Sequence, residues 1–253
     1  MNAPAPLHHP DMTAAEWQAR CDLAALYRIV DHLGWTDILN THMSARIPGE
    51  PNAFLINHCE EMFHEITASS LIKMDLDGNV LGKKGRFNPA GFTIHSGIYK
   101  ARPDANCVMH THTRAGAGVA MAKSGLRPIS QDALNVLDEV AYHEYGTPAT
   151  QSECDALGVS CQKGSCLILL NHGLLTHGPT IPAALQKMYM LERACELELI
   201  ARGLGEPPVE VAPEVVADLA RILKGMRAKP EYGLHEWNAL VRLVDAKGSE
   251  YRC

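Results

Sequence analysis

The sequence predicts an α/β fold, an α/β/α sandwich with helices on both faces of a largely antiparallel central sheet. Three observations favour this class. Helical and strand patterns alternate along most of the 253 residues, and helices fall both between the strands and at the ends. The first three expected strands follow one another through short turns, which indicates an antiparallel meander. A hydrophobic fraction of 46% is enough for a full core at this length.

Helix caps and periodic patterns locate the expected elements. Thr13, Asn88 and Thr180 are typical N-cap residues, and helical patterns follow them to about residues 33, 102 and 203. Shorter helices are expected over 114–124, 152–161, 213–227 and 231–247. Strands are expected over 40–47, 53–57, 71–76, 107–109, 139–145 and 165–170.

Three segments are expected along the chain. Residues 1–12 contain three prolines and predict a flexible tail, residues 13–205 form the main domain, and residues 206–253 form a C-terminal helical arm. The arm follows a proline-rich linker and carries aromatic residues, which are enriched at the cores of subunit interfaces. We therefore expect the arm to pack on a neighbouring subunit, and the alternative is that it folds back on its own domain.

Composition excludes several functional classes. A net charge of −6 without a basic cluster argues against nucleic-acid binding. No apolar run approaches the roughly 18 residues of a transmembrane helix, and the N-terminus lacks the pattern of a secretory signal. The eight cysteines include no CxxC pair, and four of them lie in apolar patterns typical of buried free thiols. We expect a cytoplasmic protein with a small-molecule substrate and no nucleic-acid or membrane partner.

Histidines at the ends of two apolar strands predict a metal site. His110 and His112 are two residues apart after a short strand, and side chains at this spacing share one face. His172 follows the later strand 165–170. Three histidine ligands leave a coordination position open for water or substrate, which is typical of catalytic metal sites. The alternative is that the HxH pair is simply polar residues at a strand end.

Eight motifs carry a resemblance to a known family: 41–46, 54–57, 65–71, 88–95, 101–105, 110–113, 139–143 and 171–174. They resemble the class II aldolase/adducin family over about residues 15–205, with the adducin-head-like branch the most similar. The resemblance implies an α/β/α sandwich, a homo-oligomer that is usually a cyclic tetramer, and metal sites near the subunit interfaces. It also implies a divalent metal on His110, His112 and His172. Zinc is the first expectation, and iron, manganese or cobalt are alternatives.

Two departures from the family pattern bear on the substrate. The sugar-phosphate aldolases carry an acidic residue in the helix before the HxH strand, and alignment on His95 places Gly91 at that position. Thr41 and His42 stand where the family usually has Gly-Asn in its phosphate cradle. The resemblance therefore implies a substrate without a phosphate group. Aromatic-acid decarboxylases and iron-dependent oxygenases of the family also lack the acidic residue.

Four residues are candidates for catalysis. Tyr142 and His143 lie on a strand expected to reach the metal, and at most one of them points inward because adjacent strand residues face opposite sides. We favour Tyr142 as the acid, and the alternative for both residues is packing or an interface contact. His95 lies on the helix beside the site, either as a catalytic group or as a hydrogen-bonded core residue. Glu60 and Glu61 lie in the loop 58–61. They could supply the base that is missing because Gly91 stands at the family's acidic position, or the loop is simply solvated.

Three further residues are candidates for substrate binding. Arg46 could hold a substrate carboxylate in a bidentate pair, or it forms a structural ion pair. Ser69 lies in a motif that fits the family pattern, and His42 lies in the altered segment that replaces Gly-Asn.

Three functional hypotheses follow. The first is a metal-dependent lyase that cleaves or decarboxylates a small, non-phosphorylated hydroxy, keto or aromatic acid through a metal-stabilised enolate. The second is a non-heme iron(II) oxygenase on the same architecture. The third is a non-catalytic, adducin-like interaction module, because a shared fold does not establish catalysis.

Overall fold

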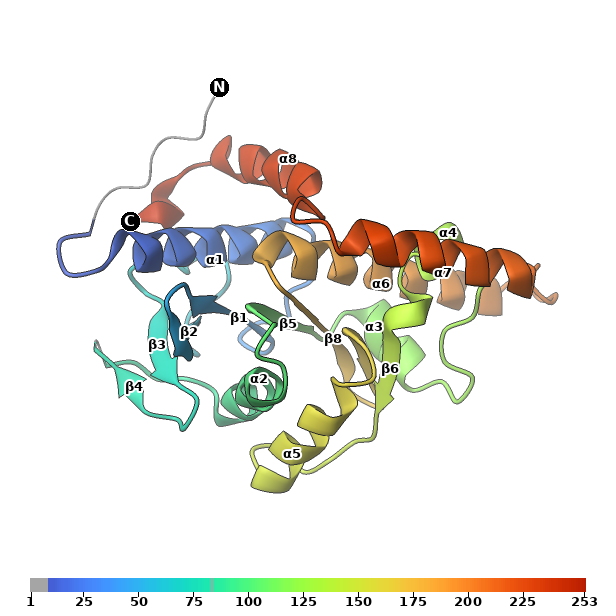
Figure 1. The fold of residues 1–253 in the computed structure, drawn as a ribbon, viewed down its shortest axis with the longest axis horizontal. Helices are drawn as coiled ribbons and strands as arrows, with labels where there is room; N and C mark the ends of the chain where they lie inside the picture. The colour runs from blue at the N-terminus through green and yellow to red at the C-terminus, as the bar shows by residue number, and fades with distance from the viewer. Residues whose placement is uncertain (1–8, 83) are drawn as a thin grey trace.

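The computed structural model describes residues 9–82 and 84–253, and its strands form one sheet (Figure 1). The strands are β1 His42–Ile47, β2 Glu50–Ile56, β3 Ile72–Asp75, β4 Val80–Leu81, β5 Cys107–Thr111, β6 Val140–His143, β7 Cys166–Leu169 and β8 Gly173–Gly178. Their order is β4-β3-β2-β1-β5-β8-β7-β6, and every neighbouring pair is antiparallel except the parallel pair β6 and β7. The expected α/β class with a largely antiparallel sheet is confirmed.

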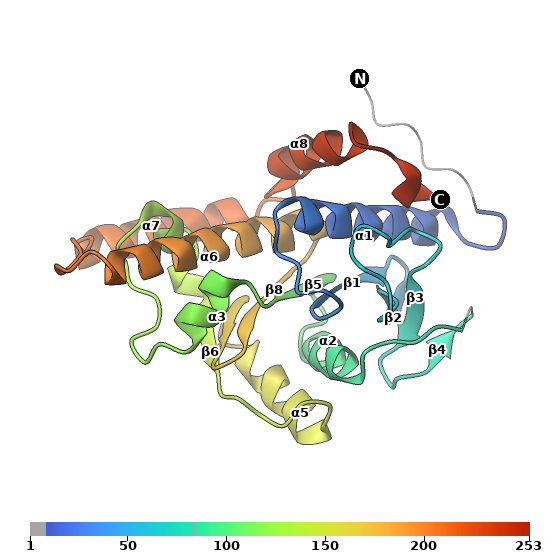
Figure 2. The ribbon, with the colours of Figure 1, turned by 180° about the vertical axis from the view of Figure 1, so that it is seen from behind.

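Helices cover both faces of this sheet (Figures 1 and 2). They are α1 Ala14–His32, α2 Pro89–Ala101, α3 Arg114–Ala120, α4 Gln131–Leu134, α5 Gln151–Ser160, α6 Ile181–Arg202, α7 Pro213–Arg227 and α8 Leu234–Asp245, with 3-10 turns η1 Leu137–Glu139 and η2 Glu250–Arg252. The long helices α1 and α6 lie on one face, and α2 and α5 lie on the other. Each face has its own buried apolar cluster.

The expected N-caps are in place. The side chains of Thr13, Asn88 and Thr180 accept hydrogen bonds from the backbone N–H groups of the first turns of α1, α2 and α6. Each cap satisfies one of the backbone donors that a helix leaves unpaired at its start. The cap of α2 matters most for function because this helix brings His95 under the sheet.

Strand β8 was not expected from the sequence, and it changes the position of His172. Residues 173–178 pair with both β5 and β7, so they fill the middle of the sheet. His172 therefore lies in the tight turn between β7 and β8, after Asn171 with a left-handed φ of 58°. A six-residue strand that begins and ends with glycine gives a weak sequence signal, because glycine is depleted in strands.

The end of the C-terminal segment packs on its own chain. Trp237 and Val244 of α8 and Tyr251 of η2 are buried in the cluster that contains α1. The carbonyl oxygens of Tyr251 and Cys253 accept hydrogen bonds from the backbone N–H groups of Ala68 and Ser69, at 2.7 and 3.0 Å. For α8 and η2, the structure therefore has the alternative arrangement of folding back, not the expected arm on a neighbouring subunit.

Two further expectations concern the tail and the membrane. Positions 1–8 of the expected flexible tail lie outside the described residues. Within residues 9–82 and 84–253, no helix combines the length and apolar character that a membrane span needs. All eight cysteines are free thiols in this part of the chain.

Candidate active site

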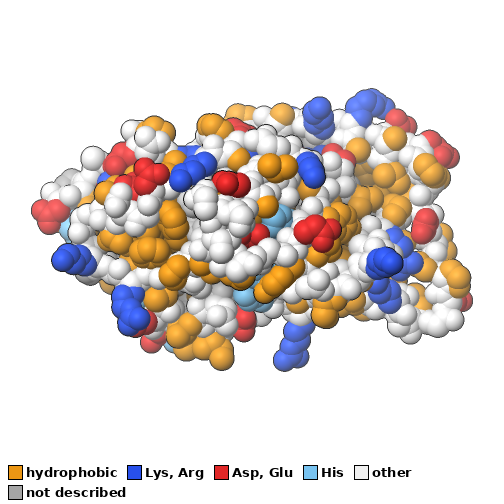
Figure 3. Space-filling model, turned by 90° about the horizontal axis from the view of Figure 1, so that it is seen from below, with side chains coloured by type: hydrophobic (Ala, Val, Ile, Leu, Met, Phe, Trp, Pro, Cys, Tyr) orange, Lys and Arg blue, Asp and Glu red, His pale blue; other side chains and the backbone are white. Residues whose placement is uncertain are grey.

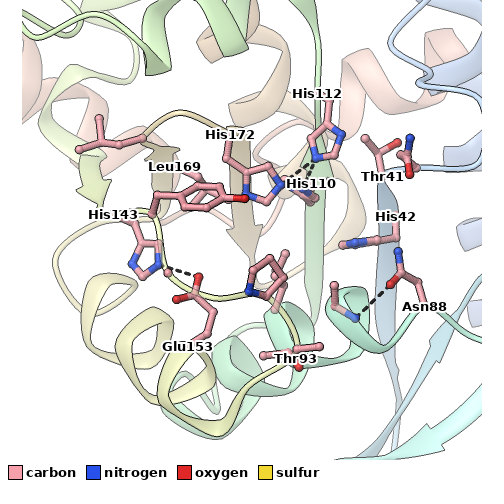
Figure 4. A pocket seen from close by; sticks show the side chains of 18 residues that line it. Thr41, His42, Asn88, Thr93, His110, His112, His143, Glu153, Leu169 and His172 are labelled. Carbon is pink, nitrogen blue, oxygen red and sulfur yellow. Dashed lines mark hydrogen bonds and ion pairs between the residues drawn. The ribbon is translucent and has the colours of Figure 1, made fainter.

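Three histidines converge at the end of β5 and the start of β8, and we call them the histidine triad (Figure 4). His110 lies in β5, His112 directly follows that strand, and His172 lies in the turn between β7 and β8. Nε2 of His112 is 2.8 Å from Nε2 of His110 and 2.9 Å from Nε2 of His172. Their ligand atoms all lie within 4.8 Å of one another, so the three side chains could hold one metal ion. The structure thus brings together the three expected metal ligands.

In two triad rings, Nδ1, the nitrogen that faces away from the other triad histidines, is hydrogen-bonded to another group. Nδ1 of His110 lies 2.9 Å from the carbonyl oxygen of Leu174, and it must donate because a carbonyl only accepts. Nδ1 of His112 donates to the carboxylate of Asp37 at 3.0 Å. A neutral imidazole has one N–H, so Nε2 of His110 and Nε2 of His112 are both bare and face each other. Converging lone pairs of this kind fit a cation between them.

Burial keeps two rings of the triad, those of His110 and His172, unprotonated. It lowers the pKa of His110 well below its usual range and the pKa of His172 to about 4, and neighbouring imidazoles act in the same direction. A histidine must be neutral to bind a metal. At neutral pH these two rings are therefore available to a cation without first releasing a proton.

The triad lies in the wall of a cavity of about 190 Å³ (Figure 4). On the face seen in Figure 3, only small areas of histidine are visible near the middle, in keeping with this burial. The described residues that line the cavity include no lysine or arginine, and Glu153 is the one carboxylate. The other polar lining residues are Asn40, Thr41, His42, Asn88, Thr93, His143 and Tyr145. A bound cation would be the source of positive charge for an anionic substrate.

A chain of hydrogen bonds runs from the cavity into the core. Nδ1 of His42 lies 2.7 Å from Nε2 of His95, and Nδ1 of His95 lies 2.5 Å from Oγ of Ser44. Oγ of Ser44 is 2.7 Å from the hydroxyl of Tyr99. His42 lines the cavity, whereas His95 is fully buried behind it. The expected catalytic candidate His95 can therefore act on a substrate only through His42.

Gly91 is required by the position of the His42 ring. A Cβ atom at Gly91 would lie 2.7 Å from Cδ2 and 2.9 Å from Nε2 of His42, which is closer than non-bonded atoms approach. The space beside the family's acidic position is thus occupied by an imidazole from the neighbouring strand β1. Glycine stands at the acidic position, as expected, and the His42 ring leaves no room for a larger side chain there.

Of the adjacent residues Tyr142 and His143, His143 lines the cavity. Its Nε2 lies 3.0 Å from Glu153 and its Nδ1 lies 2.9 Å from Oγ of Ser160. Tyr142 lies on the other side of the strand, is 40% exposed, and accepts a hydrogen bond from the backbone N–H of Leu126. The two residues face opposite sides as expected, and within this chain His143, and not the favoured Tyr142, faces the cavity. Alternation alone does not show which of the two sides faces the metal.

Four other candidates lie outside the cavity. Arg46 donates to the carbonyl oxygens of Tyr99 and Ala105 at 2.6 and 2.9 Å, and its guanidinium lies over the Tyr99 ring, so it is a structural cation. Glu60 forms an exposed ion pair with Arg86. The other two candidates, Glu61 and Ser69, also do not line the cavity. Within this chain, none of the four residues therefore lies at the cavity where their expected roles would place them.

Sequence reasoning missed several residues that the fold adds to the site. Asp37, which binds His112, is 75 residues away from it, and Ser44 is 51 residues from His95. Glu153 and Tyr145 reach the cavity from the region after β6. Ser44 could have been identified as a site residue because it lies in the motif 41–46. No sequence pattern around Asp37 indicates a contact with the site.

Comparisons with known proteins identify the family of this chain. Residues 21–199 match the family described as Class II Aldolase and Adducin N-terminal domain. A provisionally named aldolase class 2 protein of Pseudomonas aeruginosa is 43% identical over 245 residues, which cover 95% of this chain and 94% of the relative. Alpha-adducin of Rattus norvegicus is 38% identical over 244 residues, but the matched part is only 33% of that longer protein.

Solved structures support the same fold. The aldolase II superfamily protein from Pseudomonas syringae has a TM-score of 0.91 and 40% identity, with 96% of this chain and 98% of that chain covered. An L-fuculose 1-phosphate aldolase from Glaciozyma antarctica has a TM-score of 0.84 and 28% identity, with 98% and 97% covered. The likeness extends over nearly the whole chain, including its C-terminal helices.

Proposed function

This chain belongs to the class II aldolase and adducin family, and from that premise we propose that it is a metal-dependent lyase. The proposed reaction is aldolase- or decarboxylase-type cleavage of a carbon–carbon bond in a small hydroxy, keto or aromatic acid without a phosphate group. The observation that carries the proposal is the pair of bare, converging Nε2 atoms of His110 and His112 at the wall of a cavity.

The chain's own residues divide the work of the proposed reaction. His110, His112 and His172 would hold the divalent ion, which would supply Lewis-acid polarisation of a substrate oxygen. Asp37 orients the His112 ring by accepting its Nδ1–H. His42 and His143 replace Tyr142 as the polar groups that face the substrate from opposite walls.

The lining of the cavity supports a substrate without phosphate. Enzymes hold phosphate groups with guanidinium or ammonium side chains or with helix N-termini. The described lining residues supply no such cation, and Pro89, in the first turn of α2, lacks a backbone N–H. The aldolase from Glaciozyma antarctica is named for a sugar phosphate, so this part of the proposal separates the present chain from a structural relative.

A reconstitution assay tests the lyase proposal. The protein is stripped with a chelator, reloaded with zinc, iron(II), manganese or cobalt, and assayed for carbonyl products or carbon dioxide. The assay uses L-fuculose 1-phosphate and a panel of non-phosphorylated hydroxy, keto and aromatic acids, with and without oxygen. We expect metal-dependent, oxygen-independent turnover of an acid and none of the sugar phosphate. Full activity of the stripped protein, or turnover of the sugar phosphate, would contradict the proposal.

Two alternatives have their own outcomes in that assay. Turnover that needs both iron(II) and oxygen would identify the oxygenase. The likeness to alpha-adducin favours the third hypothesis, an interaction module without catalysis. A protein that binds no divalent ion and turns over no substrate, while retaining its fold, would support that module instead of an enzyme.

We also infer that the protein is a homo-oligomer, with a tetramer as the expected state. Large hydrophobic side chains are exposed on the surface of the described chain, among them Ile38, Met121 and the cavity-lining Tyr145. Exposed apolar surface of this kind is typical of interaction sites. Light scattering during size-exclusion chromatography measures the assembly, and a monomeric mass at micromolar concentration would contradict the inference.

A further inference from the structure

We propose that His42 is a fixed hydrogen-bond donor to a substrate oxygen, and that the buried chain of Tyr99, Ser44 and His95 sets this role by selecting its tautomer. The proposal rests on the proposed function only in taking the cavity as the substrate site. The tautomer itself can be measured without any turnover.

The four side chains form one unbranched series. Consecutive polar atoms from His42 through His95 and Ser44 to Tyr99 are separated by 2.7, 2.5 and 2.7 Å. Strand β1 supplies His42 and Ser44, and helix α2 supplies His95 and Tyr99. All four residues are buried, so water does not compete for these bonds.

The direction of the series follows from its buried end. In the described part of the chain, the hydroxyl of Tyr99 has Ser44 Oγ as its hydrogen-bond partner, and its ring packs against Phe54. If Tyr99 donates to Ser44, then Ser44 donates to Nδ1 of His95, and Nε2–H of His95 donates to Nδ1 of His42. The reverse direction would leave the phenol proton of Tyr99 without an acceptor in the apolar core, which is the costlier arrangement.

Each imidazole of the series accepts a hydrogen bond at one ring nitrogen, so its proton is on the other nitrogen. His95 accepts from Ser44 at Nδ1 and therefore carries its proton on Nε2. Because Nδ1 of His42 accepts from His95, the single proton of His42 is on Nε2. This N–H lies beside Gly91 and has no hydrogen-bond partner among the described residues, while the His42 side chain lines the cavity.

A donor at this position selects a particular ligand chemistry. A protonated Nε2 cannot bind a metal ion, so His42 is not a fourth ligand although its ring centroid is 5.1 Å from that of His110. The N–H can donate to a carbonyl, carboxylate or hydroxyl oxygen that is bound next to the triad. His95, Ser44 and Tyr99 are positioning residues that act through His42.

Nitrogen NMR of the protein with zinc added and ¹⁵N-labelled histidine tests the tautomer. His42→Gln assigns the signals of His42. We expect a protonated Nε2 and a bare Nδ1 in the native chain, and a mixture of both tautomers after Ser44→Ala. Tyr99→Phe, which should shift the balance less, serves if Ser44→Ala does not fold. Tyr27→Phe is the matched control, because Tyr27 is another buried phenol that bonds to β1 but lies outside the series.

Three NMR outcomes would contradict the proposal or a part of it. A bare Nε2 on His42 in the native chain would overturn the proposal. An unchanged tautomer in both Ser44→Ala and Tyr99→Phe would overturn the role of the buried chain. Loss of the native tautomer in Tyr27→Phe would mean that general loosening, not the series, sets the proton position.

Calorimetric titration of the zinc-loaded protein with acetohydroxamate tests the donor role with an oxygen ligand that can chelate the metal. We expect His42→Leu to weaken binding about tenfold or more, and His42→Gln, which retains an N–H donor, to weaken it by about threefold at most. Native affinity in His42→Leu would overturn the proposal. A protein that binds no zinc would refute the proposed lyase, whereas the NMR result on His42 would still stand.

Discussion

Two groups of histidines lie at the same cavity, although only His42 of the second group lines it, and the two groups have opposite hydrogen-bonding arrangements. In the triad of His110, His112 and His172, outer N–H groups are bonded away from the cavity and bare Nε2 atoms converge. In the pair of His42 and His95, the inner nitrogens are bonded to each other and the series ends on a buried phenol. Hydrogen-bond partners, and not proximity alone, therefore distinguish a metal ligand from a proton-bearing donor.

This comparison also shows why the family's acidic residue is not simply deleted here. The space beside Gly91 holds the ring of His42, so a neutral donor stands where the sugar-phosphate aldolases carry a negative charge. The metal site and the donor site can then be changed independently, because they share no side chain. The following predictions test that independence, from the largest expected effect to the smallest.

Acid should lower the free energy of unfolding through the buried His95 more than through an exposed histidine. The pKa of His95 is lowered to about 3 from an unfolded value near 6.5, so its stabilising contribution is present above pH 6.5 and is lost as the pH falls toward 3. In metal-free protein, His95→Gln should reduce the loss of unfolding free energy between pH 7.5 and pH 4 by about 3 kcal/mol. Urea unfolding at both pH values measures this, with His64→Gln at an exposed histidine as the control. Equal losses in the native chain and His95→Gln would contradict it.

Gly91→Ala should disturb the pair and leave the triad intact. Its new Cβ would overlap the His42 ring, so the ring or helix α2 must move. We expect a loss of about 1–3 kcal/mol in unfolding free energy, with unchanged metal content. Chemical unfolding and elemental analysis measure the two quantities. Gly225→Ala is the control, since that glycine lies in α7 with nothing within 4 Å of its Cβ position. Loss of the metal in Gly91→Ala would show that the two groups are coupled.

Asp37→Asn should affect the triad and spare the pair. Asparagine keeps the size of Asp37 but weakens the charge-assisted bond that orients His112. We expect metal affinity to fall about 10- to 100-fold. Competition with a zinc indicator dye measures the affinity, and the His42 tautomer should remain native. An unchanged zinc affinity would show that Asp37 does not contribute to metal binding.

Tyr142→Phe should have the smallest effect on the cavity. Tyr142 faces the other side of β6, and its hydroxyl bonds to the backbone of Leu126. Within one chain, we expect a stability loss of about 0.5–1.5 kcal/mol from that bond and turnover within about twofold of native. Steady-state kinetics measures the second quantity. A loss of turnover of 100-fold or more would restore Tyr142 as the acid, acting on a neighbouring subunit's cavity.

The parts of the fold that the sequence predicted depend on local signals. The caps Thr13, Asn88 and Thr180 act within one helical turn, so their positions could be read directly. Strand β8 is short and bounded by glycines, and its identity as a central strand depends on pairing with β5 and β7. The order of strands in the sheet is likewise a property of contacts far apart in the chain.

The candidate site divides in the same way. The HxH spacing is local, and His110 and His112 were found from it. The direction in which Tyr142 and His143 face depends on the sheet that β6 joins, and no pattern within the strand determines it. The contact of Asp37 with His112 forms only when distant segments meet, so sequence analysis alone could not find it.

Metal content tests the central claim most directly. Inductively coupled plasma mass spectrometry of protein purified without chelator measures bound metal per chain for the native protein, His112→Ala and the control His177→Gln. His177 is a buried histidine of β8 that bonds to the Gly164 carbonyl and lies outside the triad. The account predicts about one divalent ion per chain in the native protein and His177→Gln, and almost none in His112→Ala. A full complement of metal in His112→Ala would contradict it.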